Sequence, residues 1–269
     1  MRMNRGSDRI EQPAAVVRDR ALERAIAENR IELRFQPQSN PRTGMVEGAE
    51  ALARWSGAES SEQLFARAAA VGLTERLSRH VQRKALAMAA KWRGPLSGLR
   101  LSLNLVPEDL AREGYDDWLV AELAAARLDP RRLTLEITES SLVIDQAVAA
   151  TRLARLREIG IEIAIDDFGT GYSNLAYLTS LPLDTLKIDR GLIADVVGGS
   201  RDRIVVKAMI GMARELGLKV VIEGVETTAQ LALVAAWECD LYQGFLTAGA
   251  LDEAELARFV KASRAAEAA

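Results

Sequence analysis

Short apolar segments alternate along the chain with longer alanine- and leucine-rich stretches whose apolar residues recur with helical spacing. The β-branched and apolar content of the short segments predicts strands at residues 31–38, 45–54, 99–106, 133–140, 162–169, 185–191, 219–226 and 241–246. Two of the helical stretches, DQAVAATRLARLREIG and RDRIVVKAMIGMARELG, end at Gly160 and Gly217, which is typical of a helix C-cap. Strands that alternate with helices predict βα units and a parallel sheet.

The connection between the first two predicted strands breaks this pattern. It contains only the residues SNPRTG, which is far too short for the crossover that parallel strands require. We therefore expect the first strand to run antiparallel to the second. Eight strands with helical returns in a chain of 269 residues favour an α/β fold, a TIM-like (β/α)8 barrel with one antiparallel strand. An open, doubly wound sheet is the alternative.

Polar residues fall at or near the carboxyl ends of the predicted strands, which form the active face of such a barrel. From the second strand to the eighth they are Glu50 and Arg54, Asn104, Glu136 and Glu139, Asp166 and Asp167, Lys187 and Asp189, Glu223 and Glu226, and Gln243. Taken singly, each acid fits a strand-end ion pair or a helix cap. Six or more carboxylates at one barrel mouth would repel one another strongly, and Lys187 and Arg54 are too few to neutralise them.

These observations favour a metal site. The ligand types are almost all oxygen, and the chain has a single histidine, so we expect Mg²⁺ or Mn²⁺ and not zinc. Asp166 and Asp167 would point to opposite faces of a regular strand, but both can turn toward the mouth where the pleat breaks. Two adjacent carboxylates suit two metals about 3.5–4 Å apart, the spacing used in phosphoryl hydrolysis.

Composition narrows the class of protein. Apolar residues make up 49% and charged residues 27% of the chain, which is typical of a globular domain. No apolar run is long enough to span a membrane, and a net charge of −3 argues against a broad surface for polymeric nucleic acid. The single cysteine, Cys239, excludes internal disulfides and favours the cytoplasm. We expect residues 1–20 to form an N-terminal arm and residues 21–269 to form the barrel.

A series of motifs resembles the EAL-domain phosphodiesterases that hydrolyse the bacterial second messenger cyclic di-GMP. The motifs, in chain order, are EALAR (50–54), NLVP (104–107), EITE (136–139), DDFGTGYSNL (166–175), KIDR (187–190), EGVET (223–227) and QG (243–244). The resemblance covers residues 21–262. It implies a TIM-like barrel with one antiparallel strand, in agreement with the short first connection.

The resemblance also implies roles for individual residues. Ligands of one metal would be Glu50, Asn104, Glu136 and Asp166, with Asp167 reaching a second metal. Around the reaction, Lys187 would contact the attacking water, Glu223 would act near the metal-bound water, and Gln243 would order the site. Substrate would be held by Gln36 and Arg54. The loop 168–175, including Phe168, Gly169, Thr170 and Gly171, would be braced by Glu139 and would control activity and contribute to a homodimer contact with the helix that follows.

The implied activity is hydrolysis of cyclic di-GMP to linear pGpG with two Mg²⁺ or Mn²⁺ ions. A catalytically inactive receptor for the same nucleotide and a protein-interaction scaffold are the alternatives. The chain departs from the family pattern after Gln243, where QGFLTAG lacks the common arginine–proline pair, and in a compressed segment after Trp55. Neither departure removes an expected metal ligand. The sequence leaves open whether the chain is complete or a piece of a longer protein.

Overall fold

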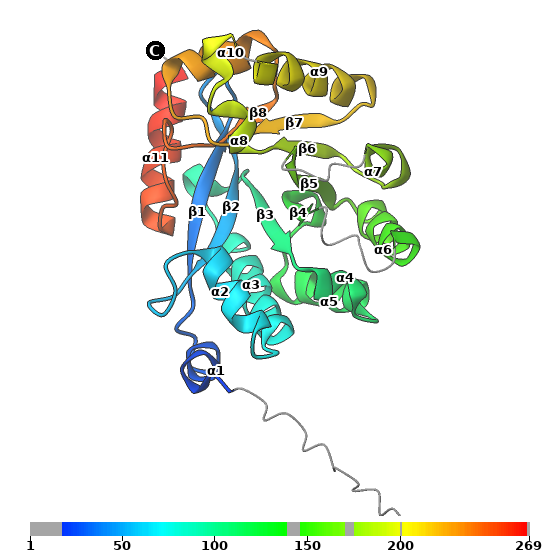
Figure 1. Cartoon of the computed structure of the whole chain (residues 1–269). Coiled ribbons are helices and arrows are strands. Elements are labelled where there is room, and N and C mark those ends of the chain that lie inside the picture. Colours follow the sequence, from blue (N-terminus) through cyan, green and yellow to red (C-terminus); the bar gives the residue numbers. More distant parts are fainter. Residues whose placement is uncertain (1–17, 139–145, 170–174, 200, 268–269) are drawn as a thin grey trace, which may run out of the picture.

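The strands close into one barrel with the helices arranged around its outside (Figure 1). The structure, a computed structural model, describes residues 18–138, 146–169, 175–199 and 201–267. Within these ranges the barrel contains eight strands: β1 (Glu32–Ser39), β2 (Val46–Arg54), β3 (Arg100–Leu105), β4 (Leu133–Thr138), β5 (Glu162–Phe168), β6 (Thr185–Ile188), β7 (Lys219–Ile222) and β8 (Leu241–Tyr242). The expected closed barrel is confirmed, and the open sheet is excluded.

The first strand is antiparallel to both of its neighbours, as the short first connection predicts. β1 pairs with β2 along its whole length, with Gln36 opposite Glu50 and Gln38 opposite Gly48. The pairs from β2–β3 to β7–β8 are all parallel, and a single β1–β8 pair, Ser39 with Tyr242, closes the ring.

The helices follow the strands in the alternating order that the sequence predicts. They are α1 (Arg20–Ala27), α2 (Ser61–Ala69), α3 (Thr74–Ala89), α4 (Pro107–Ala111), α5 (Tyr115–Ala126), α6 (Gln146–Glu158), α7 (Ala176–Ser180), α8 (Arg190–Ile193), α9 (Arg201–Glu215), α10 (Thr228–Ala236) and α11 (Glu253–Glu267). Gly160 and Gly217 end α6 and α9 with positive φ angles of 100° and 73°, so the two predicted C-caps are confirmed. None of the helices in the described ranges combines the length and the apolar character needed to cross a bilayer.

Helix α1 begins where the expected N-terminal arm gives way to the barrel domain. Asp19 caps the helix by accepting a hydrogen bond from the Leu22 backbone N–H, and Leu22 itself is fully buried. Most of the expected arm, residues 1–17, lies outside the described residues.

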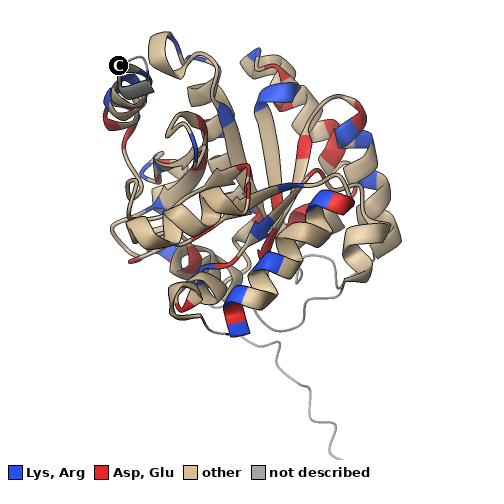
Figure 2. Cartoon of the chain, turned by 90° about the horizontal axis from the view of Figure 1, so that it is seen from above, with Lys and Arg blue, Asp and Glu red and all other residues tan. Residues whose placement is uncertain are grey.

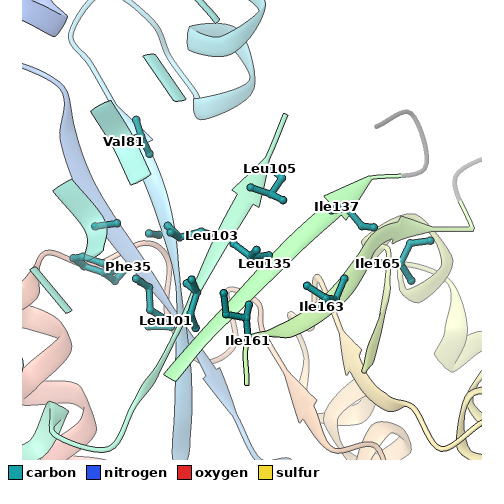
Figure 3. Packing of buried hydrophobic residues seen from close by; sticks show 14 of the residues in the cluster. Phe35, Val81, Leu101, Leu103, Leu105, Leu135, Ile137, Ile161, Ile163 and Ile165 are labelled. Carbon is teal, nitrogen blue, oxygen red and sulfur yellow. The ribbon is translucent and has the colours of Figure 1, made fainter. Parts of the chain in front are cut away.

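Alternate residues along the central strands point to opposite faces, and the two faces differ in chemistry. Figure 3 labels the apolar side, which includes Leu101 and Leu103 on β3, Leu135 on β4 and Ile163 on β5. These residues pack in the main hydrophobic cluster together with helix residues such as Val81. The intervening residues of the same strands are polar or small and point into the barrel, as their contacts across it show below.

Three predicted strands, β6, β7 and β8, end three or four residues earlier in the structure than the sequence indicates. β6 ends at Ile188 because Asp189 caps α8, with its side chain accepting a hydrogen bond from the Gly191 N–H at 2.7 Å. β7 ends at Ile222, and Gly224, with φ of +67°, turns the chain out of the sheet. β8 ends at Tyr242. The residues beyond these ends form the loops of the barrel mouth. They include polar side chains and do not continue the sheet pairing.

We predict that Gly244→Ala lowers the free energy of unfolding by at least about 2 kcal/mol, because a backbone clash has no side-chain rotation to relieve it. A Cβ atom at Gly244 would lie 2.1 Å from the Val225 carbonyl oxygen. Gly98→Ala is the matched control, because no atom lies within 4 Å of the Cβ that it would add. Urea unfolding of both variants measures the difference, and equal stabilities would show that the β7–β8 loops do not pack as described.

Candidate active site

A buried lysine lies at the centre of the barrel among four carboxylates. Lys187 on β6 is 1% exposed, and its Nζ atom lies 2.8 Å from Glu136 Oε2, 2.9 Å from Asp166 Oδ2, 2.8 Å from Glu223 Oε1 and 3.6 Å from Glu50 Oε2. We call these five residues the lysine cluster. The acids come from β2, β4, β5 and the residue after β7, so the cluster joins opposite sides of the barrel (Figure 2 views the barrel from above).

Two amide side chains hold the outer part of the lysine cluster. Asn104 Nδ2 donates to Glu50 Oε1 at 2.7 Å. Gln243 Nε2 donates to Glu50 Oε2 at 2.9 Å and to Glu223 Oε1 at 2.8 Å. These hydrogen bonds fix the orientation of the Glu50 and Glu223 carboxylates, as in a preorganised ligand set.

Gln38 is a functional residue that sequence reasoning missed. Its Nε2 donates to Glu136 Oε1 at 3.4 Å and to Gln243 Oε1 at 3.2 Å, and its Oε1 accepts from Ser102 Oγ at 3.3 Å. A Cβ atom on the facing Gly48 would lie 2.8 Å from that Oε1 atom, so the glycine makes room for the amide. The available signal was the spacing of two residues from Gln36, which places both glutamines on one face of the strand.

The adjacent acids at the end of β5 share one side because the strand contains a bulge. Ile165 pairs with Leu186 and Phe168 pairs with Ile188, so Asp166 and Asp167 together face the single residue Lys187. Asp167 takes a left-handed conformation with φ of +57°, and its backbone N–H donates to Asp166 Oδ1 at 2.9 Å. The predicted break in the pleat is confirmed, and an extra residue in one strand is its physical cause.

Burial and mutual interaction shift the pKa values of the residues in and beside the lysine cluster. Burial raises the pKa of Glu223 to about 8, although the charge of Lys187 opposes this shift. Burial and the neighbouring Asp166 raise the pKa of Asp167 to about 6. Burial alone would lower the pKa of Lys187, but the surrounding acids outweigh it and raise that pKa well above its usual value. Lys187 therefore keeps its proton, and one ammonium does not fully offset the acids.

The donor set fits a hard divalent cation. Oxygen atoms of Asp166, Asp167 and Glu223 all lie within 4.8 Å of one another. Glu50 and Glu136 contact the same ammonium as Asp166 and Glu223, and Asn104 is hydrogen-bonded to Glu50, so further oxygen donors lie close by, with no sulfur or imidazole in this set. Oxygen donors in this number are what Mg²⁺ and Mn²⁺ prefer.

The two predicted substrate-binding residues, Gln36 and Arg54, lie outside the lysine cluster. Gln36 faces Glu50 across the β1–β2 pair and donates through Nε2 to the Ala248 carbonyl at 3.4 Å. Arg54 is half-buried and donates to the Ala53 carbonyl at 2.9 Å; burial lowers its pKa, and the charge of Glu50 opposes that shift. Both lie beside the lysine cluster and not in it.

The expected control loop, residues 168–175, is described at Phe168, Gly169 and Leu175. Phe168 is 1% exposed and packs in the hydrophobic core. Gly169 has φ of +109°, and a Cβ atom there would meet the Leu192 side chain. Glu139, Thr170 and Gly171 lie outside the described residues.

Comparison with known proteins identifies relatives over almost the whole chain. The family described as "EAL domain" matches residues 19–250. The chain is 40% identical over 255 residues to "Cyclic di-GMP phosphodiesterase NbdA" of Pseudomonas aeruginosa, an alignment that covers 90% of this chain and 32% of the relative. This chain spans about a third of the length of the first curated relatives that it matches.

Solved structures with the same fold include complexes with a cyclic dinucleotide. "PaMucR Phosphodiesterase, c-di-GMP complex" is 34% identical, with a TM-score of 0.81 and coverage of 87% of this chain and 97% of that chain. "Klebsiella pneumoniae BlrP1 pH 8.0 calcium/cy-diGMP complex" is 31% identical, with a TM-score of 0.74 and coverage of 82% of this chain and 56% of that chain. The family match, the sequence identities and the fold therefore agree with one family.

We predict that Lys187→Met destabilises the metal-free protein by about 3–5 kcal/mol, because its buried acids lose their compensating charge. The pKa values of buried Glu136 and Glu223 are already raised in the wild type. Without the ammonium these two acids should hold protons to still higher pH in the folded variant but ionise at ordinary pKa values in the unfolded chain, so the loss should grow as the pH rises from 5 to 8. Urea unfolding in a chelator measures both effects. Lys219→Met, which removes a half-exposed ammonium paired with Glu162 at 2.9 Å, should cost less than about 1 kcal/mol. A loss that does not change with pH would contradict the cluster.

We also predict that the affinity for Mg²⁺ or Mn²⁺ rises with pH. Asp167 and Glu223, with pKa values of about 6 and about 8 in the metal-free protein, hold protons at low pH that a metal must displace. Affinity should therefore increase through pH 6 and level off above pH 8, and binding should release protons. Calorimetry in buffers of different ionisation enthalpy counts those protons. Binding without proton release at pH 6.5 would be inconsistent with this ligand set.

Proposed function

The chain belongs to the EAL domain family, and from this premise we propose that it is a metal-dependent phosphodiesterase that hydrolyses cyclic di-GMP to linear pGpG. The observation that carries the proposal is the lysine cluster, with four carboxylates gathered on a buried ammonium at the carboxyl ends of the strands. The names of the relatives support the choice of substrate.

The ligand assignment follows from where the oxygen donors lie. Glu50, Asn104, Glu136 and Asp166 would hold one cation, and Asp167 and Glu223 would contribute to a second. Mg²⁺ or Mn²⁺ would supply neutralisation of the phosphate charge and a bound water of lowered pKa. Gln243 already orients Glu50 and Glu223, so these side chains lose little conformational entropy when a cation binds.

Lys187 acts in this proposal as a fixed cation. The surrounding acids raise its pKa in the metal-free protein, which favours an orienting cation over the base that removes a proton from water. Its ammonium lies in the middle of the acids, where it orients the attacking water by a hydrogen bond and attracts the phosphodiester anion. In the reaction, water adds to one phosphorus, one bond from phosphorus to a 3′ oxygen breaks, and that oxygen leaves as a hydroxyl. A single cut opens the ring and gives pGpG.

Substrate binding requires groups beside the cluster, and Gln36 and Arg54 occupy such positions. The Arg54 guanidinium suits a phosphate oxygen because it always carries charge and presents several donors. The Gln36 amide can both donate and accept, which suits the groups next to the phosphate.

Two further assignments complete the proposal. A homodimer would form through the loop and helix after Asp167, where Leu175, just before α7, is 56% exposed. Within that loop, Phe168 and Gly169 would anchor the segment that controls activity, with Glu139, Thr170 and Gly171 as its other members. The protein would act in the cytoplasm, in keeping with its single, buried, free Cys239.

The test is incubation of the purified protein with cyclic di-GMP and either Mg²⁺ or Mn²⁺, with chromatography of the products. We expect pGpG with at least one metal and none in a chelator. Glu50→Ala should abolish turnover, since it removes a ligand, the acceptor of the Asn104 hydrogen bond and one of the two acidic acceptors of Gln243. Glu28→Ala, which changes an exposed acid at the C-cap of α1, is the control and should retain full activity.

Two results would contradict the proposal. Tight binding of cyclic di-GMP without pGpG under both metals would show a receptor. Full activity of Glu50→Ala would show that the lysine cluster is not the reaction centre.

A further inference from the structure

A cavity of about 140 Å³ lies in the barrel beneath the lysine cluster, on the side opposite the active face. Its lining at the cluster end includes Gln38, Glu136 and Lys187. Its lining at the amino end includes Arg100, Glu162 and Lys219, which are the first or near-first residues of β3, β5 and β7. We call this space the axial cavity. It extends from the amino ends of the strands to the underside of the buried ammonium.

Small side chains create the axial cavity. The interior of a (β/α)8 barrel is ordinarily filled by bulky branched residues, which leaves no pore. Here the inward positions at the middle of the barrel carry Gly48, Ser102, Ala164 and Thr185, all of which line the cavity. In the sheet register Ala164 pairs with Thr185, Ser102 pairs with Glu50, and Gly48 pairs with Arg100 at the amino end of β3. The space is therefore a property of the sequence at these positions.

The lining is suited to water. A water molecule occupies about 30 Å³ in the liquid and needs two to four polar partners, so the space admits several molecules. Hydroxyl groups of Ser102, Thr134 and Thr185 line the middle of the cavity, and the cluster end carries amide, carboxylate and ammonium groups. Apolar cavities of similar size stay dry, but charged groups on this lining make an empty cavity costly.

The amino end of the cavity is close to solvent. Glu162 Oε1 lies 3.1 Å from Arg100 Nη2 and 2.9 Å from Lys219 Nζ, and the Lys219 side chain is 51% exposed. This ion-paired trio lines the amino end of the cavity together with the exposed residues Arg42 and Glu47. Surface ion pairs of this kind are weak, so their side chains exchange with water readily.

A hydrogen-bonded route connects the cavity with the active face. Ser102 Oγ donates to Gln38 Oε1, and Gln38 Nε2 donates to Glu136 and Gln243. Gln243 in turn orients Glu50 and Glu223. A change in the cavity that moves Gln38 would therefore reach the side chains that surround the ammonium.

We propose that the axial cavity is a water site, in which a persistent chain of water molecules joins solvent at the amino face to Gln38, Glu136 and Lys187 and fixes their positions. The site is separate from the substrate mouth, and its waters remain in place when a substrate covers the active face. Gln38, Ser102 and Thr185 are positioning residues in this account, because they act through the lysine cluster and do not touch the substrate.

Water relaxation dispersion on the metal-free protein tests the occupancy directly, since it counts internal waters of long residence. We expect several such waters in the wild type and fewer in Ala164→Val, whose added methyl groups point into the axial cavity. Ala121→Val makes the same change on the exposed side of α5 and should leave the count unchanged. No difference between the wild type and Ala164→Val would overturn the water site.

The positioning role is tested by kinetics on the same variants with cyclic di-GMP, a readout that rests on the proposed function. We expect kcat of Ala164→Val to fall about tenfold with KM unchanged, the size of effect that small misplacements produce. Ala121→Val should match the wild type. If Ala164→Val does not fold, Thr185→Val, which replaces a lining hydroxyl without adding volume, decides the question by the same two measurements.

The outcomes separate this inference from the proposed function. Loss of internal water with kcat unchanged would overturn the positioning role. If the wild type hydrolyses no cyclic di-GMP, the proposed function fails, whereas the water count still decides the water site. Metal affinity of the same variants, measured by calorimetry, then replaces kcat, and an unchanged affinity would overturn the positioning role.

Discussion

One buried positive charge holds the centre of this protein together. Lys187 has almost no contact with solvent, and its removal from water is compensated only because three carboxylates lie within 2.9 Å of its Nζ atom and a fourth lies at 3.6 Å. Those carboxylates belong to four separate segments of the barrel. The same contacts therefore close the barrel interior and assemble the acids at one point, so that stability and chemistry depend on one group.

The two-residue period of the strands decides which chemistry each face receives. On β3, β4 and β5 the odd-numbered residues form the apolar layer beneath the helices, as Figure 3 shows for Leu103, Leu135 and Ile163. The even-numbered residues as far as Asp166 point inward and are polar or small. The bulge at Asp166 and Asp167 then reverses the alternation, so that Phe168 packs in the core. Burial of apolar area outside the barrel supplies the stability that a polar interior does not. The interior is thereby free to hold charge near the carboxyl ends and open space near the amino ends.

Much of this arrangement is predictable from local patterns. Alternating strands and helices indicated the barrel, the six-residue first connection indicated the antiparallel strand, and the recurring acids indicated a shared site. The ends of β6, β7 and β8 were not predictable, because apolar residues continue past them into loops that Asp189 and Gly224 redirect. Gln38 and the axial cavity were missed for a different reason. Both depend on side chains that meet across the barrel. The spacing of Gln38 from Gln36 indicates a shared strand face, but it does not indicate the contacts of Gln38 with Glu136 and Gln243.

The central claim is that the acids around Lys187 bind divalent cations, which in turn bind the phosphodiester of the substrate. Anomalous diffraction from crystals grown with Mn²⁺, and with cyclic di-GMP under Ca²⁺, measures this most directly. The account predicts anomalous density among Glu50, Asn104, Glu136, Asp166, Asp167 and Glu223, with the phosphate of the nucleotide against it and Lys187 still beside the acids. Density elsewhere on the chain, or a nucleotide bound away from these carboxylates, would contradict it.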